Sequence, residues 1–165
     1  MTSAASMIDS HPRSGQVDTN LLSDTIDSLV EASRTARQCA DACVHEPAPM
    51  TECIGANLDA ADMCAASVSI LIRLGDRDTV VAALEAAREA LRVCAEDCRR
   101  HGSHLRHCTT CASVCEHAED LCVQMSTALT TRTGSTPAVD PSRDRLSPGA
   151  TLDAPSGAAE PNEPA

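Results

Sequence analysis

The stretch from Cys108 to Leu129 reads CTTCASVCEHAEDLCVQMSTAL. Its apolar and cysteine positions recur at alternating steps of three and four residues, which is the period of one face of an α-helix. The stripe consists of Cys108, Cys111, Cys115, Ala118, Cys122, Met125 and Leu129. Because cysteine stands where a soluble bundle would carry leucine, the stretch predicts a buried helix lined with thiols.

Three further segments carry the same period, and each combines aliphatic residues with cysteines. Their stripes are Leu22, Ile26, Leu29, Ala36, Cys39 and Cys43 in the first; Cys53, Asn57, Ala60, Cys64, Leu71 and Leu74 in the second; and Leu84, Ala87, Leu91, Cys94 and Cys98 in the third. The sequence therefore predicts four helices, over about 19–44, 50–74, 76–101 and 103–130.

Local signals indicate where these helices begin and end. Asp18 or Asn20 is expected to cap the first helix, and Ser103 the fourth. Two prolines in 45–49 must end the first helix, and Gly75 is expected to end the second. The three connections are short, and short connections make consecutive helices antiparallel. The expected fold class is all-α, an antiparallel up-down-up-down four-helix bundle with a Cys-lined core.

The two ends of the chain differ from this central region. Residues 1–17 lack an apolar period and are predicted to be a disordered leader. Residues 131–165 are rich in Pro, Ala, Ser and acidic side chains and are predicted to be a disordered tail. The metal-binding bundle is therefore expected over 18–130.

Composition excludes several classes of function. The 165 residues include 10 cysteines and no Phe, Tyr or Trp, and the net charge is −11 with a pI near 4.8. A nucleic-acid-binding protein would need a basic face. Neither a signal peptide nor an apolar run of membrane-spanning length is apparent, so no membrane association and a cytoplasmic location are expected. In a reducing compartment the cysteines indicate metal binding or redox chemistry before disulfides.

The cysteines also form an internal repeat. The segment Cys39-Ala-Asp-Ala-Cys43 resembles Cys94-Ala-Glu-Asp-Cys98, and the offset between them equals the offset between Cys53 and Cys108. In an antiparallel bundle these six cysteines share the end that holds the loops after the first and third helices. Cys64 and Cys122 would lie deeper, and aliphatic residues would line the opposite end.

Soft thiolates select soft ions, and Cu(I) is the best match in a reducing compartment. Cysteines at i and i+4 face the same way on a helix and can clamp one ion; the three such pairs are Cys39/Cys43, Cys94/Cys98 and Cys111/Cys115. Capacity should approach one ion per thiolate, roughly ten. Zinc prefers closed tetrahedral Cys/His sites, which a helical ladder of cysteines suits poorly.

Further soft or borderline ligands lie near the loops at the sulfur-lined end. His104 precedes Cys108 by four residues and is expected to capture copper and pass it inward. His101, His45 and Met50 flank the same loops and are further candidate ligands. The alternative is that these loop histidines are exposed to solvent and bind no metal.

The Cys-lined antiparallel bundle, the Cys-Ala-Asp/Glu-x-Cys repeat and the His-rich loop end resemble the four-helix-bundle copper storage proteins, in particular their cytosolic branch. The resemblance covers about 19–130. It implies storage of many Cu(I) ions in each bundle, protection of those ions from harmful redox chemistry, and assembly into homo-oligomers. One half of this core is aliphatic, whereas the cytosolic members carry more cysteine, which implies a lower capacity.

Two other functions remain open at this point. One is an iron–sulfur electron-transfer protein, which would need about four essential cysteines; only Cys108 and Cys111 have a typical cluster spacing. The other is a thiol redox sensor with one low-pKa cysteine and a resolving partner. Because no catalytic constellation is recognisable, no enzymatic activity is expected. A copper-delivering or copper-accepting protein is the expected protein partner.

Overall fold

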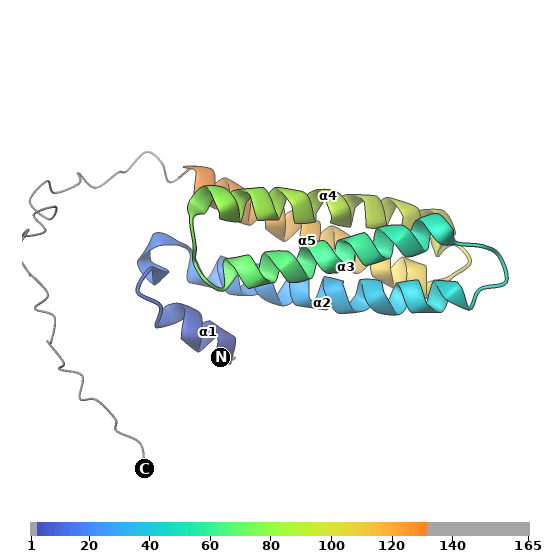
Figure 1. Ribbon diagram of the computed structural model, residues 1–165, viewed down its shortest axis with the longest axis horizontal. Coiled ribbons are helices and arrows are strands. Elements are labelled where there is room, and N and C mark those ends of the chain that lie inside the picture. The colour runs from blue at the N-terminus through green and yellow to red at the C-terminus, as the bar shows by residue number, and fades with distance from the viewer. Residues whose placement is uncertain (1–2, 132–165) are drawn as a thin grey trace, which may run out of the picture. The chain divides into compact units, whose positions relative to one another are not determined.

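The computed structural model describes residues 3–131, with side chains placed from Ala5 onward. Four long helices make up most of this region: α2 (Thr19–Val44), α3 (Thr51–Leu71), α4 (Arg77–Gly102) and α5 (Arg106–Thr131). Consecutive helices run antiparallel, and α5 packs against both α4 and α2, which closes the bundle (Figure 1). The predicted fold class and helix order are confirmed.

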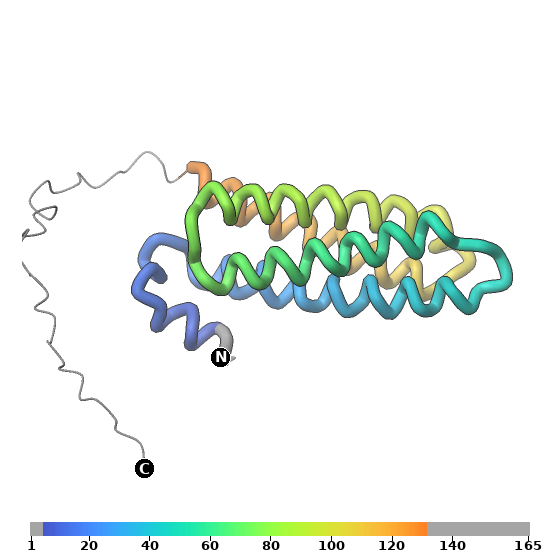
Figure 2. The backbone as a smooth tube through the Cα atoms, in the orientation of Figure 1, coloured from blue at the N-terminus to red at the C-terminus, as the bar shows by residue number. Residues whose placement is uncertain are grey.

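The two ends of the bundle can be followed along the chain trace in Figure 2. The loops after α2 and α4 lie at one end, and the loop after α3 lies at the other, next to the start of α2. This arrangement puts the cysteine-rich ends of α2 and α4 beside the cysteine-rich starts of α3 and α5. We call the end with the loops at 45–50 and 103–105 the mouth.

The leader is the first point at which the structure corrects the sequence prediction. Instead of disorder, the described part of 1–17 contains helix α1 (Ser3–Asp9) and a 3-10 turn, η1 (Ser14–Gln16). Ile8 is buried in the core, and the Arg13 guanidinium donates to the carbonyl oxygen of Leu74 at 3.0 Å. A single apolar residue and one charge were too weak a pattern to predict docking on the bundle. The predicted tail, beyond Thr131, lies outside the described residues.

Helix ends are partly as predicted. Asp18 caps α2, accepting from the backbone N–H groups of Asn20 and Leu21. Ser103 does not cap α5, which begins at Arg106; it is instead the C-cap of α4. α3 ends at Leu71, earlier than Gly75, and the left-handed turn residue is Leu74 (φ 45°). Leu74 tolerates this conformation because its side chain is buried and its carbonyl oxygen is bound by Arg13.

Every residue of the four predicted stripes is buried. Leucines fill the end away from the mouth, and each contributes about 1.5–3 kcal/mol when it is removed from water. Cysteine and alanine fill the half towards the mouth, where small side chains allow the helices to lie close together. The bundle therefore has an aliphatic half and a thiol-lined half, as the sequence predicted.

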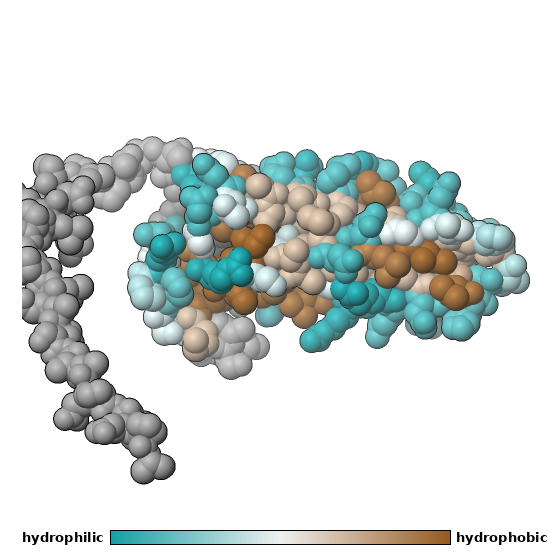
Figure 3. Space-filling view, in the orientation of Figure 1, coloured by the Kyte–Doolittle hydropathy of each residue, from teal (hydrophilic) through white to brown (hydrophobic). Residues whose placement is uncertain are grey.

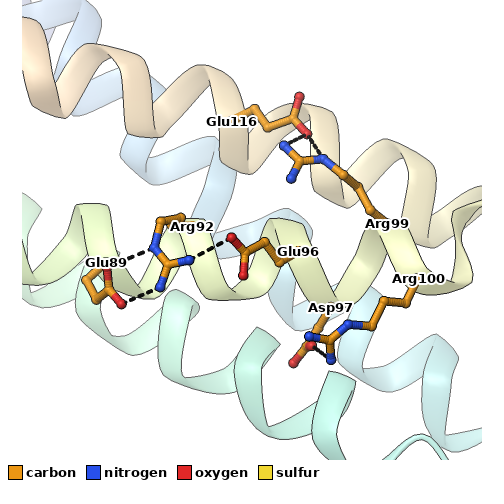
Figure 4. A network of polar contacts seen from close by, with 7 residues as sticks. All are labelled: Glu89, Arg92, Glu96, Asp97, Arg99, Arg100 and Glu116. Carbon is orange, nitrogen blue, oxygen red and sulfur yellow. Dashed lines mark hydrogen bonds and ion pairs between the residues drawn. The ribbon is translucent and has the colours of Figure 1, made fainter.

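The surface of α4 and α5 carries ion pairs (Figure 4). Arg92 bonds to Glu89 and Glu96 along α4, each at 2.6 Å, and Arg99 reaches across to Glu116 on α5. All of these side chains are between about two-fifths and just over half exposed, so solvent screens the pairs and they contribute little to stability. Of these pairs, only Arg99–Glu116 joins α4 to α5, and none of them holds the fold together.

The outer face of α3 is less polar. On the face seen in Figure 3, hydrophilic residues flank a band of apolar and near-neutral residues that runs over α3. Leu58 and Ile72 are 44% and 51% exposed. Within the described residues, α3 alone is long and apolar enough to cross a bilayer by length and composition. That is weak evidence, because the core helix of a bundle passes the same test, and α3 turns Asn57 and two cysteines into the core.

Candidate metal centre

All ten cysteines are buried free thiols. Eight of them form a connected set near the mouth. Cys98 lies at its centre, with its Sγ 3.8 Å from the Sγ atoms of both Cys39 and Cys53. Cys43 extends the set from Cys53 (3.9 Å), and Cys108 extends it from Cys39 (4.0 Å). These five sulfurs come from all four helices and form the outer part of the centre.

The inner part is a triangle of sulfurs from α4 and α5. Cys115 Sγ lies 3.6 Å from Cys94 Sγ and 4.0 Å from Cys111 Sγ, and the Cys94–Cys111 distance is 3.9 Å. The triangle contains the i, i+4 pair Cys111/Cys115, as the spacing predicted. Cys94 and Cys98, also at i and i+4, share none of the candidate metal groups, because each is grouped with sulfurs of other helices.

Asn57 lies between the outer and inner parts. Its amide nitrogen donates to the Cys53 carbonyl oxygen at 2.7 Å and to Cys53 Sγ at 3.3 Å. Its amide oxygen accepts from the Cys111 and Cys94 thiols at 3.0 and 3.4 Å. A fully buried amide needs such partners, and here the partners are the thiols themselves. Asn57 thereby holds sulfurs of both parts in place.

Four groups of three or four ligand atoms lie close enough together to hold an ion, within the part of the chain that the structure describes. They are Cys39/Cys43/His107/Cys108, Cys39/Cys98/Cys111, Cys53/Cys98/Cys108 and Cys94/Cys111/Cys115. The groups share Cys39, Cys98, Cys108 and Cys111. Adjacent ions could therefore be bridged by common sulfurs, and soft thiolates of this kind are ligands for Cu(I).

Electrostatics inside this centre depend on contacts among the thiols. Contact with the thiols of Cys111 and Cys39 lowers the pKa of Cys98, and contact with the thiols of Cys111 and Cys94 lowers the pKa of Cys115 to about 5. Contact with Cys39 and Cys98, together with burial, raises the pKa of Cys53. A single thiolate is stabilised by the thiols around it, whereas several adjacent thiolates repel one another. Deprotonation of the whole set therefore needs the positive charge of bound metal.

Cys64 and Cys122 lie deeper than the other eight. Burial, followed by the nearby Cys115 and Cys122, raises the pKa of Cys64 to about 12. Burial and the nearby Glu119 raise the pKa of Cys122 to about 12. Neither belongs to a group of three ligand atoms among the described residues. The structure therefore separates these two from the connected set, and the sequence analysis had also placed them deeper in the bundle.

The mouth contains a residue that the sequence-based site set missed. His107 Nε2 lies 3.6 Å from Cys43 Sγ, and His107 Nδ1 lies 4.0 Å from Glu46 Oε1. The available signal was its position next to Cys108 and four residues before Cys111. That signal was ambiguous, because the side chain that faces the core at a helix start depends on where the helix begins.

The predicted mouth ligands are placed differently. His104 and His45 are exposed, His101 is half-buried, and none of the three joins a candidate metal group. Met50 is buried at the start of α3, where it is the N-cap residue. His104 lies in the turn before α5, because the helix starts later than predicted.

The fold and this centre together define a class of protein, the thiol-lined four-helix bundles that bind metal. The sequence model of the copper storage protein (Csp) family matches residues 18–127, which covers the bundle. The chain belongs to this copper storage protein family. A comparison with curated proteins finds no match.

Solved structures agree with this assignment. The copper storage protein Ccsp from Streptomyces lividans, loaded with 10 copper equivalents, is 29% identical with a TM-score of 0.73, and the match covers 76% of this chain and 99% of that chain. A histidine-to-alanine variant of the same Ccsp is 32% identical with a TM-score of 0.67, covering 68% and 98%. A form of this cytosolic protein with five coppers is 30% identical with a TM-score of 0.64, covering 66% and 93%.

Proposed function

We propose that this protein stores copper in the cytosol as several Cu(I) ions bound by the ten cysteine thiolates inside the bundle. The observation that carries the proposal is the set of overlapping ligand groups, which share four of their sulfurs. A shared sulfur can bridge two soft ions, so the centre suits many ions better than one. The copper-loaded Streptomyces relative, described as cytosolic, supports the same interpretation.

The storage mechanism follows from burial. Each thiol is at most 2% exposed, so bound copper is shielded from water and from oxidants. Copper displaces thiol protons when it binds, so the affinity should fall as the pH is lowered. The aliphatic half keeps the metal-free protein folded, so that the site exists before copper arrives. Such a protein acts by binding and release, and we infer no catalytic role.

An iron–sulfur protein is the competing interpretation. It would be expected to isolate about four cysteines around one cluster. Here Sγ–Sγ contacts of 3.6–4.0 Å join five cysteines in the outer part and three in the inner part, the group Cys39/Cys98/Cys111 spans both parts, and two more cysteines lie deeper. This distribution favours storage, as does membership of the copper storage family.

The partners of storage are also part of the proposal. The apolar outer face of α3, with Leu58 and Ile72 exposed, favours assembly into a homo-oligomer. Copper would come from or go to another copper-carrying protein at the mouth, where His104, His101 and His45 offer exposed or half-buried imidazoles. The acidic net charge gives no support to nucleic-acid binding.

The experiment is an anaerobic titration of the reduced, metal-free protein with Cu(I), followed by near-ultraviolet absorbance and competition with a Cu(I) chelator. The chain has no Tyr or Trp, so thiolate-to-copper bands appear on an almost empty background. Storage predicts a linear rise that ends near one copper per cysteine. A rise that ends after one or two equivalents would contradict storage and favour a sensor or carrier.

A further inference from the structure

We propose that the mouth of the bundle holds one Zn²⁺ ion in the copper-free protein, bound by Cys39, Cys43, Cys108 and Nε2 of His107. This inference concerns a second metal and does not depend on copper storage. Among the described residues, this group alone of the four candidate groups combines three thiols with an imidazole. The other three groups contain three thiols each.

The ligand set is one that zinc uses. Structural zinc sites are tetrahedral and take four nitrogen or sulfur ligands, including three cysteines with one histidine. Cu(I) is softer, and thiolate sulfurs alone satisfy it. The imidazole therefore distinguishes the mouth group from the three-sulfur groups. The sequence argued against zinc because a helical ladder lacks closed sites, but the mouth group closes one by joining α2 to the first turn of α5.

The distances fit the ion. With Zn–S near 2.3 Å and Zn–N near 2.0–2.1 Å, tetrahedral angles put two sulfurs about 3.8 Å apart and a sulfur and nitrogen about 3.6 Å apart. The observed Cys43 Sγ–His107 Nε2 distance is 3.6 Å, and the Cys39 Sγ–Cys108 Sγ distance is 4.0 Å. All four ligand atoms lie within 4.8 Å of one another. Small side-chain rotations bring them onto one ion.

A second observation concerns the other face of the imidazole. Metal-binding histidines almost always donate their second ring N–H to a carboxylate or carbonyl, which fixes the tautomer and orients the ring. Glu46 Oε1 lies 4.0 Å from Nδ1 of His107. A proton on Nδ1 pointing at Glu46 leaves the lone pair on Nε2, which faces Cys43. The 4.0 Å separation is longer than a hydrogen bond, so Glu46 has to move closer for Nδ1–H to donate to it when zinc binds.

The location also suits a hydrated divalent ion. The side chain of His107 is 25% exposed and that of Glu46 is 28% exposed, whereas the three thiols are buried. Zinc can therefore reach the group from solvent and lose its waters at the mouth. The inner triangle has no imidazole and no solvent-exposed member.

Zinc at the mouth would compete with copper. Cys39 also belongs to the group with Cys98 and Cys111, and Cys108 belongs to the group with Cys53 and Cys98. A zinc ion at the mouth occupies sulfurs that both groups use, so zinc and copper compete for them. Thiolates prefer Cu(I), so copper displaces the zinc as it fills the centre.

The test is an anaerobic Zn²⁺ titration of the reduced, metal-free full-length chain in competition with a chromophoric zinc indicator. We expect one equivalent to be held. The His107→Ala variant should weaken that binding by at least about 100-fold, and Glu46→Gln by about 10- to 100-fold. The matched control is His117→Ala, whose exposed imidazole lies on α5 outside the group, and it should bind zinc like the parent. Circular dichroism establishes that each variant is folded.

Two further measurements use the same samples. Co²⁺ bound in place of zinc should give the visible bands of a tetrahedral site with sulfur ligands, and His107→Ala should change them. Cu(I) added to the zinc-loaded protein should release the zinc to the indicator. The proposal is overturned if no zinc is retained against the indicator, if His107→Ala holds zinc as well as His117→Ala, or if zinc stays bound at full copper load. None of these results alters the copper titration of the metal-free protein.

Discussion

The division of the core into two halves makes a prediction about Leu29→Ala. Leu29 is fully buried on α2, ten residues before Cys39, which is about 15 Å along the helix axis. Removing three buried carbon groups costs about 2.4 kcal/mol in transfer free energy, at about 0.8 kcal/mol per group. The cavity left behind adds to this, so the free energy of unfolding of the metal-free protein should fall by about 2.7–5 kcal/mol.

The same substitution should leave copper binding nearly unchanged in the folded protein, because no sulfur moves. The assay is urea unfolding of the metal-free protein, followed by circular dichroism, together with the copper titration. Copper-loaded Leu29→Ala should regain most of the lost resistance to unfolding, since the ion binds the folded state. Cys111→Ala is the matched control in the other half, with a small loss of stability and a reduced copper capacity.

The reasoning is refuted if folded Leu29→Ala binds markedly less copper than the parent, or if its unfolding free energy falls by less than about 1 kcal/mol. The first result would mean that the two halves are coupled, and the second that the leucine end does not hold the metal-free fold together.

Other predictions address the thiols and the mouth. Cys115→Ala should lower copper capacity by a small increment, measured by the end point of the Cu(I) titration; loss of all binding would instead indicate one discrete cluster. Burial raises the pKa of Cys64 and Cys122 from 9.0 to about 12, so above pH 9 the unfolded chain binds fewer protons than the folded one. The metal-free protein should keep its stability below about pH 9 and lose up to about 1.4 kcal/mol per pH unit per thiol as the pH rises towards 12, measured by urea unfolding. A double Cys64→Ala/Cys122→Ala variant should lose less over this range, and an equal loss would remove these thiols as the cause. His104→Ala should slow copper loading more than it lowers capacity, measured by stopped-flow absorbance, and an unchanged rate would exclude His104 from uptake.

The helical period predicted most of the fold. Each stripe, such as Cys108 to Leu129, identifies the face of a helix that must be buried, and all its members are buried. The helical period and the loop lengths together were sufficient to predict a four-helix bundle, because the apolar faces of four antiparallel helices can all be buried in one shared core. Softness of the thiolate was sufficient to favour copper, because that choice depends on ligand chemistry and not on geometry.

The exact helix starts could not be predicted from local signals. Ser103 looked like a helix cap, yet α5 starts at Arg106. That shift determines which histidine points inward: His107 contacts Cys43, whereas His104 stays in the exposed turn. Packing of the turn between α4 and α5 determines where α5 begins, and the apolar period of the sequence does not predict that residue.

The sequence by itself determined that ten thiols lie on the inner faces of four helices. Only the tertiary structure decided which sulfurs meet, because the axial register between helices depends on packing and not on the period. It put Cys94 and Cys98 into different candidate metal groups, placed Asn57 between the outer and inner sulfurs, and set His107 beside Cys43 and Cys108. A helical period specifies a direction around one axis, whereas a metal site needs positions on several axes at once.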